Sequence, residues 1–135
     1  MSDLKVPPHS LEAEQSVLGA ILIDKNAIVE VAGFLRPEHF YENSHTLVFT
    51  AMLALYEKRE PIDLVTLTEV LKKKKELQDL GGVAYLSELA AKVPTSSHVE
   101  HYGRIVKDYH TKRELIKQAG KVTEWAFDGE KDVKD

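Results

Sequence analysis

The feature that most constrains this fold is a long helical pattern on the C-terminal side of the chain. Residues 97–127 contain no proline, and the pattern runs up to Asp128-Gly129, which can end a helix. Ser97 and Glu100 have the spacing of a capping box, in which each side chain binds a backbone N–H at a helix start. We therefore expect the helix to begin at about residue 97. At 1.5 Å per residue, it would be roughly 45 Å long.

This helix is longer than the body from which it extends, because residues 1–96 should fold to a body about 33 Å across. Its first turns, from Val99 to Val106, can pack on that body, and the polar stretch 107–114 follows. We expect that nothing in the chain covers the apolar side chains further on: Leu115, Ile116, Ala119, Val122, Trp125, Ala126 and Phe127. An apolar stripe left exposed in this way indicates a contact with a partner.

A kink in the long helix is the alternative to this overhang. Gly103 or the polar stretch 107–114 could turn the helix back, so that the body covers the apolar stripe. A glycine costs only about 1 kcal/mol in a helix interior, so Gly103 does not force a break. We favour the straight helix.

The rest of the chain has the pattern of shorter helices separated by turns. Residues that can cap a helix stand at the expected starts: Ser10, Asp24, Asn43 and Asp63. Residues that break helices separate them: Arg36-Pro37, Pro61, Gly81-Gly82 and Val93-Pro94. No sustained alternation of apolar and polar residues predicts a strand. We therefore predict an all-α protein, with a compact multi-helix orthogonal bundle as a head and a long C-terminal helix after it.

The expected parts follow from these boundaries. Residues 1–8, which end in Pro7-Pro8, form an extended arm, and residues 9–96 form the helical head. Residues 97–127 form the long helix, and residues 128–135 begin whatever follows it.

Composition and charge exclude several classes of function. The 135 residues include no cysteine, which leaves no disulfide framework and no thiolate metal site. Eighteen Lys and Arg residues against 22 Asp and Glu give a net charge of −4, which is unfavourable for a stand-alone nucleic-acid binder. No apolar run reaches the roughly 18–20 residues of a membrane span, and residues 1–15 do not resemble a secretory signal. We expect a cytosolic domain with no membrane partner.

No phosphate-binding or catalytic motif is found, so we predict no catalytic residue and no cofactor in these residues. The patterns GxxxxGK[ST] and GxGxxG are absent, and Gly81-Gly82 is interpreted as a turn between helices. Carboxylate pairs such as Glu12 and Glu14 lack the buried apolar surroundings that acid–base catalysis requires. Ser97 is accounted for as a cap.

The six histidines do not predict a metal site. His98 and His101 lie three residues apart on one helix face, beside Glu100, but a zinc site needs a third or fourth ligand. We interpret them as surface or capping residues, and a metal-dependent enzyme is the least favoured reading. His39 and His45 flank a turn and are expected to bind loop backbone.

The run Lys72–Lys75 supports an alternative function, a salt-dependent nucleic-acid contact. Four consecutive lysines point all round a helix, however, and acidic residues surround them. No aromatic residue interleaves the run to stack on bases. A solvated helix end is the favoured interpretation, so that direct nucleic-acid binding is weak or absent.

Taken in order, a set of short motifs resembles the N-terminal domain of the DnaB-type replicative DNA helicases. The resemblance runs from about Val6 to Phe127. It rests on Pro7-Pro8, the residues from Glu12 to Gly19, Phe40-Tyr41, His45, Ala51-Met52, Pro61 to Leu67, Gly81 to Leu86, Val93 to Thr95, Tyr102, Ile105 and Val106. The core and turn positions of this set are Ala13, Glu14, Gly19, Pro61, Asp63, Gly81, Gly82 and Tyr85.

The resemblance implies that the long helix is the first arm of a helical hairpin and that residues 128–135 belong to its turn. Such hairpins pair between subunits, so that six domains form a trimer-of-dimers collar; the apolar stripe would then be an oligomer interface. It also implies docking of primase through its C-terminal helicase-binding domain, action of helicase loaders, and a bacterial cytoplasmic location. The ATP- and magnesium-dependent motor of the family lies C-terminal to this domain. The helicase-binding domain of primase has a similar fold, but the N-terminal position of the proline-containing segment argues against it.

Overall fold

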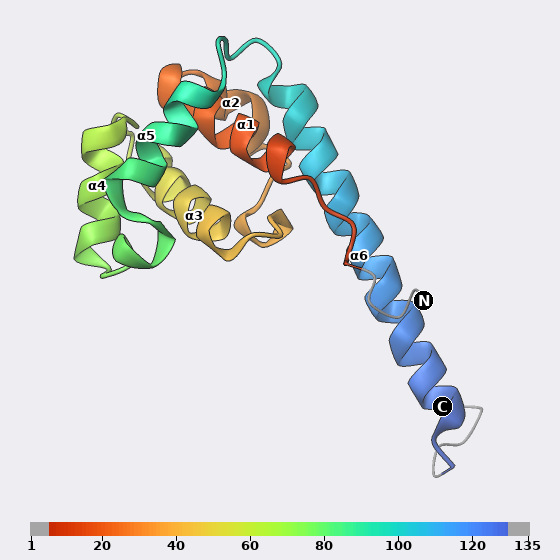
Figure 1. Ribbon diagram of the computed structural model, residues 1–135. Coiled ribbons are helices and arrows are strands. Elements are labelled where there is room, and N and C mark those ends of the chain that lie inside the picture. Colours follow the sequence, from red (N-terminus) through yellow and green to blue (C-terminus); the bar gives the residue numbers. More distant parts are fainter. Residues whose placement is uncertain (1–5, 130–135) are drawn as a thin grey trace.

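The computed structural model describes residues 6–129 and is all-helical over that range, which confirms the predicted fold class (Figure 1). Residues 1–5 of the expected arm and residues 130–135 of the expected hairpin turn lie outside the described residues. The elements in order are α1 (Leu11–Ile23), α2 (Ala27–Ala32), η2 (Pro37–His39), α3 (Asn43–Glu57), α4 (Leu64–Lys73), η3 (Gln78–Leu80), α5 (Gly82–Lys92) and α6 (Val99–Phe127).

Local capping chemistry sets several of these boundaries. The Ser10 hydroxyl accepts the Ala13 N–H at 3.1 Å and begins α1. Asp63 and Thr66 form a reciprocal capping box at the start of α4, with distances of 2.9 and 3.0 Å. The predicted turn at Gly81-Gly82 is confirmed, since both residues have positive φ, 107° and 71°.

Helix α1 lies at the centre of the head and packs against α3, α5 and α6 (Figure 1). The approach to α5 is close enough that a Cβ built on Gly19 would lie 2.2 Å from the carbonyl oxygen of Leu89. Gly19 therefore permits direct backbone contact between two helices.

Helix α6 begins later than the sequence predicted. It starts at Val99, and no side chain caps it, so the capping box at Ser97 and Glu100 is wrong. Tertiary and local contacts draw the preceding residues elsewhere: the Ser96 hydroxyl donates to the Asp24 carboxylate at 2.7 Å, and the Ser97 N–H donates to the Thr95 hydroxyl at 3.2 Å. The first of these contacts joins the crossing from α5 to α6 to the end of α1.

Helix α6 is continuous and extends well past the head, so the kinked alternative is wrong (Figure 1). Gly103 is one of its three buried residues and lies against α2 and the turn that follows it. A Cβ at this position would come within 2.9 Å of Val31 and 3.1 Å of Phe34. The glycine therefore serves close packing of α6 on the head, not a bend.

Candidate assembly surface

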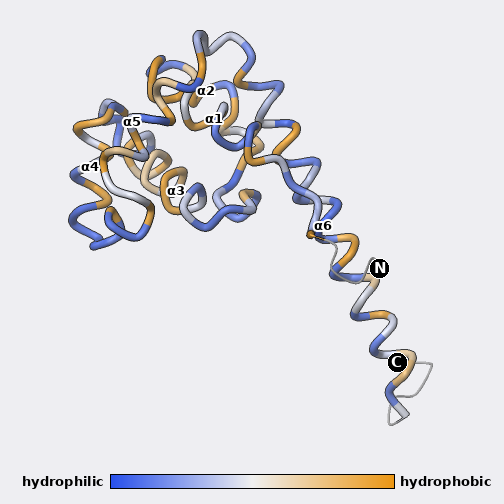
Figure 2. The backbone as a smooth tube through the Cα atoms, in the orientation of Figure 1, coloured by the Kyte–Doolittle hydropathy of each residue, from blue (hydrophilic) through white to orange (hydrophobic). Residues whose placement is uncertain are grey.

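The distal half of α6 contains apolar residues, whose positions are the orange segments along the projecting helix in Figure 2, and most of their side chains are exposed. Leu115, Ile116 and Val122 are 64%, 59% and 64% exposed, and Phe127 is 86% exposed. Ala119 and Ala126 are also exposed, while Trp125 is half-buried. The predicted exposure of this stripe in the single chain is thus confirmed for six of its seven residues.

Helical geometry places the stripe on one side of α6. Leu115, Ala119, Val122 and Ala126 recur at intervals of three and four residues and therefore share a face. Ile116 and Phe127 flank that face on one side and Trp125 on the other, at 100° per residue. The opposite side carries exposed Lys117, Lys121 and Glu124. The distal half of α6 is therefore amphipathic although no part of the head touches its apolar face.

Arg113 joins α6 to two other segments at the point where the helix leaves the head. Its Nη1 donates to the Pro8 carbonyl and its Nη2 to the His39 carbonyl, each at 2.8 Å. The guanidinium also lies 5.4 Å from the centre of the Tyr41 ring, on which His9 stacks at 3.9 Å. Sequence reasoning missed this residue, because it placed Arg113 in an undifferentiated polar stretch.

His39 binds loop backbone, as the sequence predicted, and it also faces α6. Its Nδ1 accepts the Arg36 N–H at 3.0 Å, and its ring lies 4.7 Å from that of His110. Burial lowers the pKa of His39, with a further reduction from the nearby His110, Lys107 and Arg36 that outweighs the opposite effect of Glu38.

This lowered pKa predicts loss of stability in mild acid. The folded state binds fewer protons at His39 than the unfolded state, so the stabilising contribution is present above the ordinary value of 6.5 and lost as the pH falls through the lower folded-state pKa. We expect the free energy of unfolding in urea to fall as the pH is lowered through and below 6.5, and to fall less in His39→Gln. An identical pH dependence in the two proteins would contradict the assignment.

A buried polar network links α1, α3 and α5 inside the head. Glu14 is only 1% exposed, and its carboxylate accepts the Tyr41 N–H at 2.7 Å and the Glu42 N–H at 3.3 Å. The Nδ1–H of buried His45 donates to the same carboxylate at 2.7 Å. Because His45 carries its proton on Nδ1, its Nε2 accepts a hydrogen bond from the Tyr85 hydroxyl. Burial raises the pKa of the Tyr85 phenol.

Two sequence predictions are corrected by this network. Glu14 was expected to lack buried surroundings, but it points into the core, where two backbone N–H groups and a histidine satisfy it. His45 was expected to bind loop backbone, but it lies within α3 and binds two side chains. The network crosses three elements and fixes their packing, because each polar atom depends on a partner from another element.

The remaining motif residues occupy core and turn positions. Ala13 is buried in the core, Pro61 is exposed between α3 and α4, and Asp63 caps α4. Gly81 and Gly82, both with positive φ, form the turn at the start of α5.

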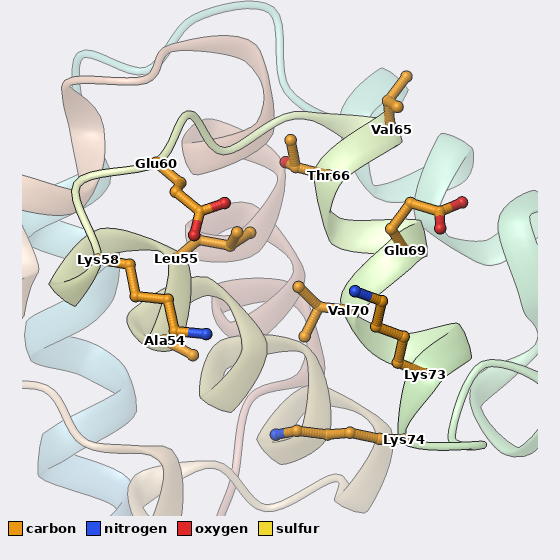
Figure 3. Close-up of a pocket in the computed structure, with 10 residues that line it drawn as sticks. All are labelled: Ala54, Leu55, Lys58, Glu60, Val65, Thr66, Glu69, Val70, Lys73 and Lys74. Carbon is orange, nitrogen blue, oxygen red and sulfur yellow. The ribbon is translucent and has the colours of Figure 1, made fainter.

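Lys72–Lys75 are all exposed at the end of α4. Beside them lies an open groove of about 400 Å³ between the ends of α3 and α4 (Figure 3). Ala54, Leu55, Val65 and Val70 supply apolar lining, and Lys58, Lys73 and Lys74 extend along its rim with Glu60 and Glu69 among them (Figure 3). The two glutamates line the groove together with the three lysines, so the lysines that line it do not form a continuous basic surface for a phosphate backbone.

His98 and His101 are exposed at the start of α6. Over residues 6–129, no three His, Asp or Glu side chains gather in a way that could hold a metal ion. None of the helices described has both the length and the apolarity to cross a membrane.

Comparison with known sequences finds a matching family and several relatives that are longer than this chain. The family described as DnaB-like helicase N terminal domain matches residues 6–108. The chain is 43% identical over 136 residues to the replicative DNA helicase DnaB of Geobacillus stearothermophilus, and 38% identical over 138 residues to the replicative DNA helicase DnaC of Bacillus subtilis. These alignments cover 98% and 100% of the chain but only 30% of each relative, so the chain spans less than a third of their length.

Comparison with solved structures agrees over most of the chain. The N-terminal domain of DnaB helicase from Mycobacterium tuberculosis gives a TM-score of 0.91 at 37% identity, covering 96% of this chain and 91% of that one. A DnaB-like replicative helicase, described with its interactions with primase, gives 0.75 at 34% identity and covers 85% of this chain and 27% of that one. The N-terminal domain of DnaB helicase from Helicobacter pylori, also described with its interactions with primase, gives 0.75 at 28% identity, covering 87% and 91%.

Proposed function

The chain belongs to the DnaB-like helicase N-terminal domain family, and on this premise we propose that it is the collar domain through which a hexameric replicative helicase assembles and docks primase. The observation that carries the proposal is the exposed apolar stripe of α6, which the head does not cover. In this role the domain performs no chemistry itself. A C-terminal motor that uses ATP and magnesium would supply the unwinding, in the bacterial cytoplasm.

The stripe suits pairing with the same stripe of a second copy. A two-fold interface uses one self-complementary surface on both subunits, and an amphipathic helix supplies such a surface when two of its apolar faces meet. Burying one large aliphatic side chain contributes roughly 1.5–3 kcal/mol, so several such residues on each helix can offset the cost of association. In the whole protein the second hairpin arm would extend this contact, and pairs of domains would form the collar.

We propose the C-terminal helicase-binding domain of primase as the second partner, with a helicase loader as a further one. Support comes from two similar structures that are described with their interactions with primase. The head and the polar side of α6 stay accessible to such a partner once the stripe is paired.

Self-association should depend on the stripe and not on the opposite face of α6. The double variant Ile116→Asp/Val122→Asp places two charges in the apolar contact, so we expect sedimentation equilibrium to show loss of any concentration-dependent dimer. Circular dichroism should still show helical signal and a cooperative melt of the head, because both residues are exposed in the single chain. The control variant Lys117→Asp/Lys121→Asp carries the same substituents on the opposite face and should self-associate like the original chain.

Two outcomes would contradict the proposal. A dimer that persists in the Ile116→Asp/Val122→Asp variant would show that the stripe is not the interface. Loss of the cooperative melt in that variant would show that the stripe belongs to the core of the head.

A further inference from the structure

The distal part of α6 is held to the head at few points. Val106, which is 2% exposed, is the last buried residue of the helix. Beyond it, His110 touches His39, and Arg113 donates its two hydrogen bonds to Pro8 and His39. In the part of the chain that the structure describes, no side chain of α6 after Arg113 hydrogen-bonds to the head. Arg113 is thus the outermost polar attachment of the helix.

We infer that Arg113 is a positioning residue that fixes the angle at which α6 leaves the head. We call its contacts with Pro8, His39 and Tyr41 the exit latch. A guanidinium suits this role, because its donors point in fixed directions within one plane and can grip two acceptors from different segments at once. A lysine ammonium has no such fork and would hold the two carbonyls less rigidly.

Both acceptors of the exit latch are themselves held in place. The His39 segment is fixed by the Arg36 N–H, which donates to the His39 ring. The Pro8 segment is fixed by the stacking of His9 on Tyr41. The N–H of Tyr41 in turn donates to buried Glu14, so the exit latch rests on the polar network of the core.

The position of the latch along α6 decides how far the helix can swing. From Val106 to Phe127 the helix is about 31 Å long, and from Arg113 to Phe127 it is about 21 Å long, at 1.5 Å per residue. Without the latch, the ring contact of His110 with His39 is what remains beyond Val106, so the pivot moves from Arg113 back toward Val106. For the same angular freedom, the end of the helix then covers a range up to roughly 1.5 times wider.

The inference deepens the proposed function, on which its consequence for assembly rests. If two copies pair through the stripe, the exit angle of each helix sets where each head stands relative to the other. The exit latch itself is a property of the single chain, so it can be tested without pairing.

Spin-label distance measurements test the exit latch directly, because the chain has no cysteine of its own. Cysteines at Glu57, at the end of α3, and at Lys121, on the polar side of α6, would carry the labels; both residues are exposed. The Ile116→Asp/Val122→Asp background keeps the labelled chains from pairing through the stripe. Pulsed electron–electron double resonance then measures the distribution of distances between the label on the head and the label on the distal part of α6.

We expect a single narrow distribution with Arg113 in place and a broader one in Arg113→Ala. The broadening should reach up to roughly 1.9-fold, because the label at Lys121 lies about 12 Å from Arg113 and about 22 Å from Val106 along the helix. Arg113→Lys and deletion of residues 1–8, which removes the Pro8 acceptor, should each give intermediate widths. The matched control is Lys112→Ala, since this exposed neighbour contacts Tyr109 of its own helix and should leave the width unchanged.

Equal widths for Arg113→Ala and Lys112→Ala would overturn the inference. If Arg113→Ala loses helical circular dichroism, the Arg113→Lys variant decides the question, because it keeps the charge and the aliphatic stem. Failure of the stripe as an interface would appear in sedimentation. Dilution of the labelled chain with unlabelled chain keeps the measured distances within one chain even if a dimer persists, so the two proposals fail separately.

Discussion

Replacing Gly19 by alanine is expected to lower the free energy of unfolding by about 3 kcal/mol, at the upper end of the usual cost of overpacking a core. The added Cβ would lie 2.2 Å from the carbonyl oxygen of Leu89, which belongs to the backbone of α5. A flexible side chain could move away from the new methyl group, but a helix backbone cannot do so without separating α1 from α5. Urea unfolding followed by circular dichroism measures the loss.

Gly120→Ala is the matched control for this prediction. Gly120 also lies inside a helix, but a Cβ there meets nothing within 4 Å. Alanine is a better helix former than glycine by about 1 kcal/mol, so the control should be neutral or slightly stabilised. If Gly19→Ala is as stable as Gly120→Ala, the close contact between α1 and α5 is wrong.

The helices themselves could be predicted because their signals are local. Ser10, Asp63 and the Gly81-Gly82 pair act on backbone groups a few residues away, and the structure finds each in its predicted role. The length of α6 followed in the same way from an uninterrupted pattern. Ser97 shows the limit of such signals, because a capping motif was outcompeted by hydrogen bonds that neighbouring Ser96 and Thr95 offer in the folded chain.

The polar contacts of the core and of the exit latch could not be predicted, because their partners are distant in sequence. Glu14 is bonded to groups 27 to 31 residues away, and Arg113 to carbonyls 74 and 105 residues away. One signal for Glu14 was present in the sequence. It lies at helical spacing from Val17, Leu18 and Ile21, on the face of α1 that is buried, where an unpartnered carboxylate would not be tolerated.

Glycines that allow close helix approach and buried polar residues both determine how the helices of the head pack. Small residues at Gly19 and Gly103 let helices approach until their backbones and side chains touch, and the buried network then fixes which helices meet. The apolar residues alone specify a collapsed head, whereas the network requires one arrangement of α1, α3 and α5, since only that arrangement satisfies its donors and acceptors.

Replacing Glu14 by alanine is therefore expected to cost about 3–5 kcal/mol, because three donors lose their charged acceptor and each donor left unsatisfied costs roughly 1–3 kcal/mol. The variant leaves the N–H groups of Tyr41 and Glu42 without an acceptor and removes the partner of the buried His45 imidazole. Of a typical domain stability of 5–15 kcal/mol, this is a large fraction. Thermal and urea unfolding followed by circular dichroism should both show it.

Further variants distinguish loss of the network from the general effect of removing a glutamate. Glu12→Ala removes an exposed carboxylate from the same helical turn and should change stability by less than about 0.5 kcal/mol. Tyr85→Phe removes only the outermost hydroxyl of the network and should cost about 1 kcal/mol. In a double-mutant cycle, Glu14→Ala and Tyr85→Phe should be non-additive, because both act through His45. Strict additivity would mean that the three side chains stabilise the head independently and that no connected network joins α1 to α5.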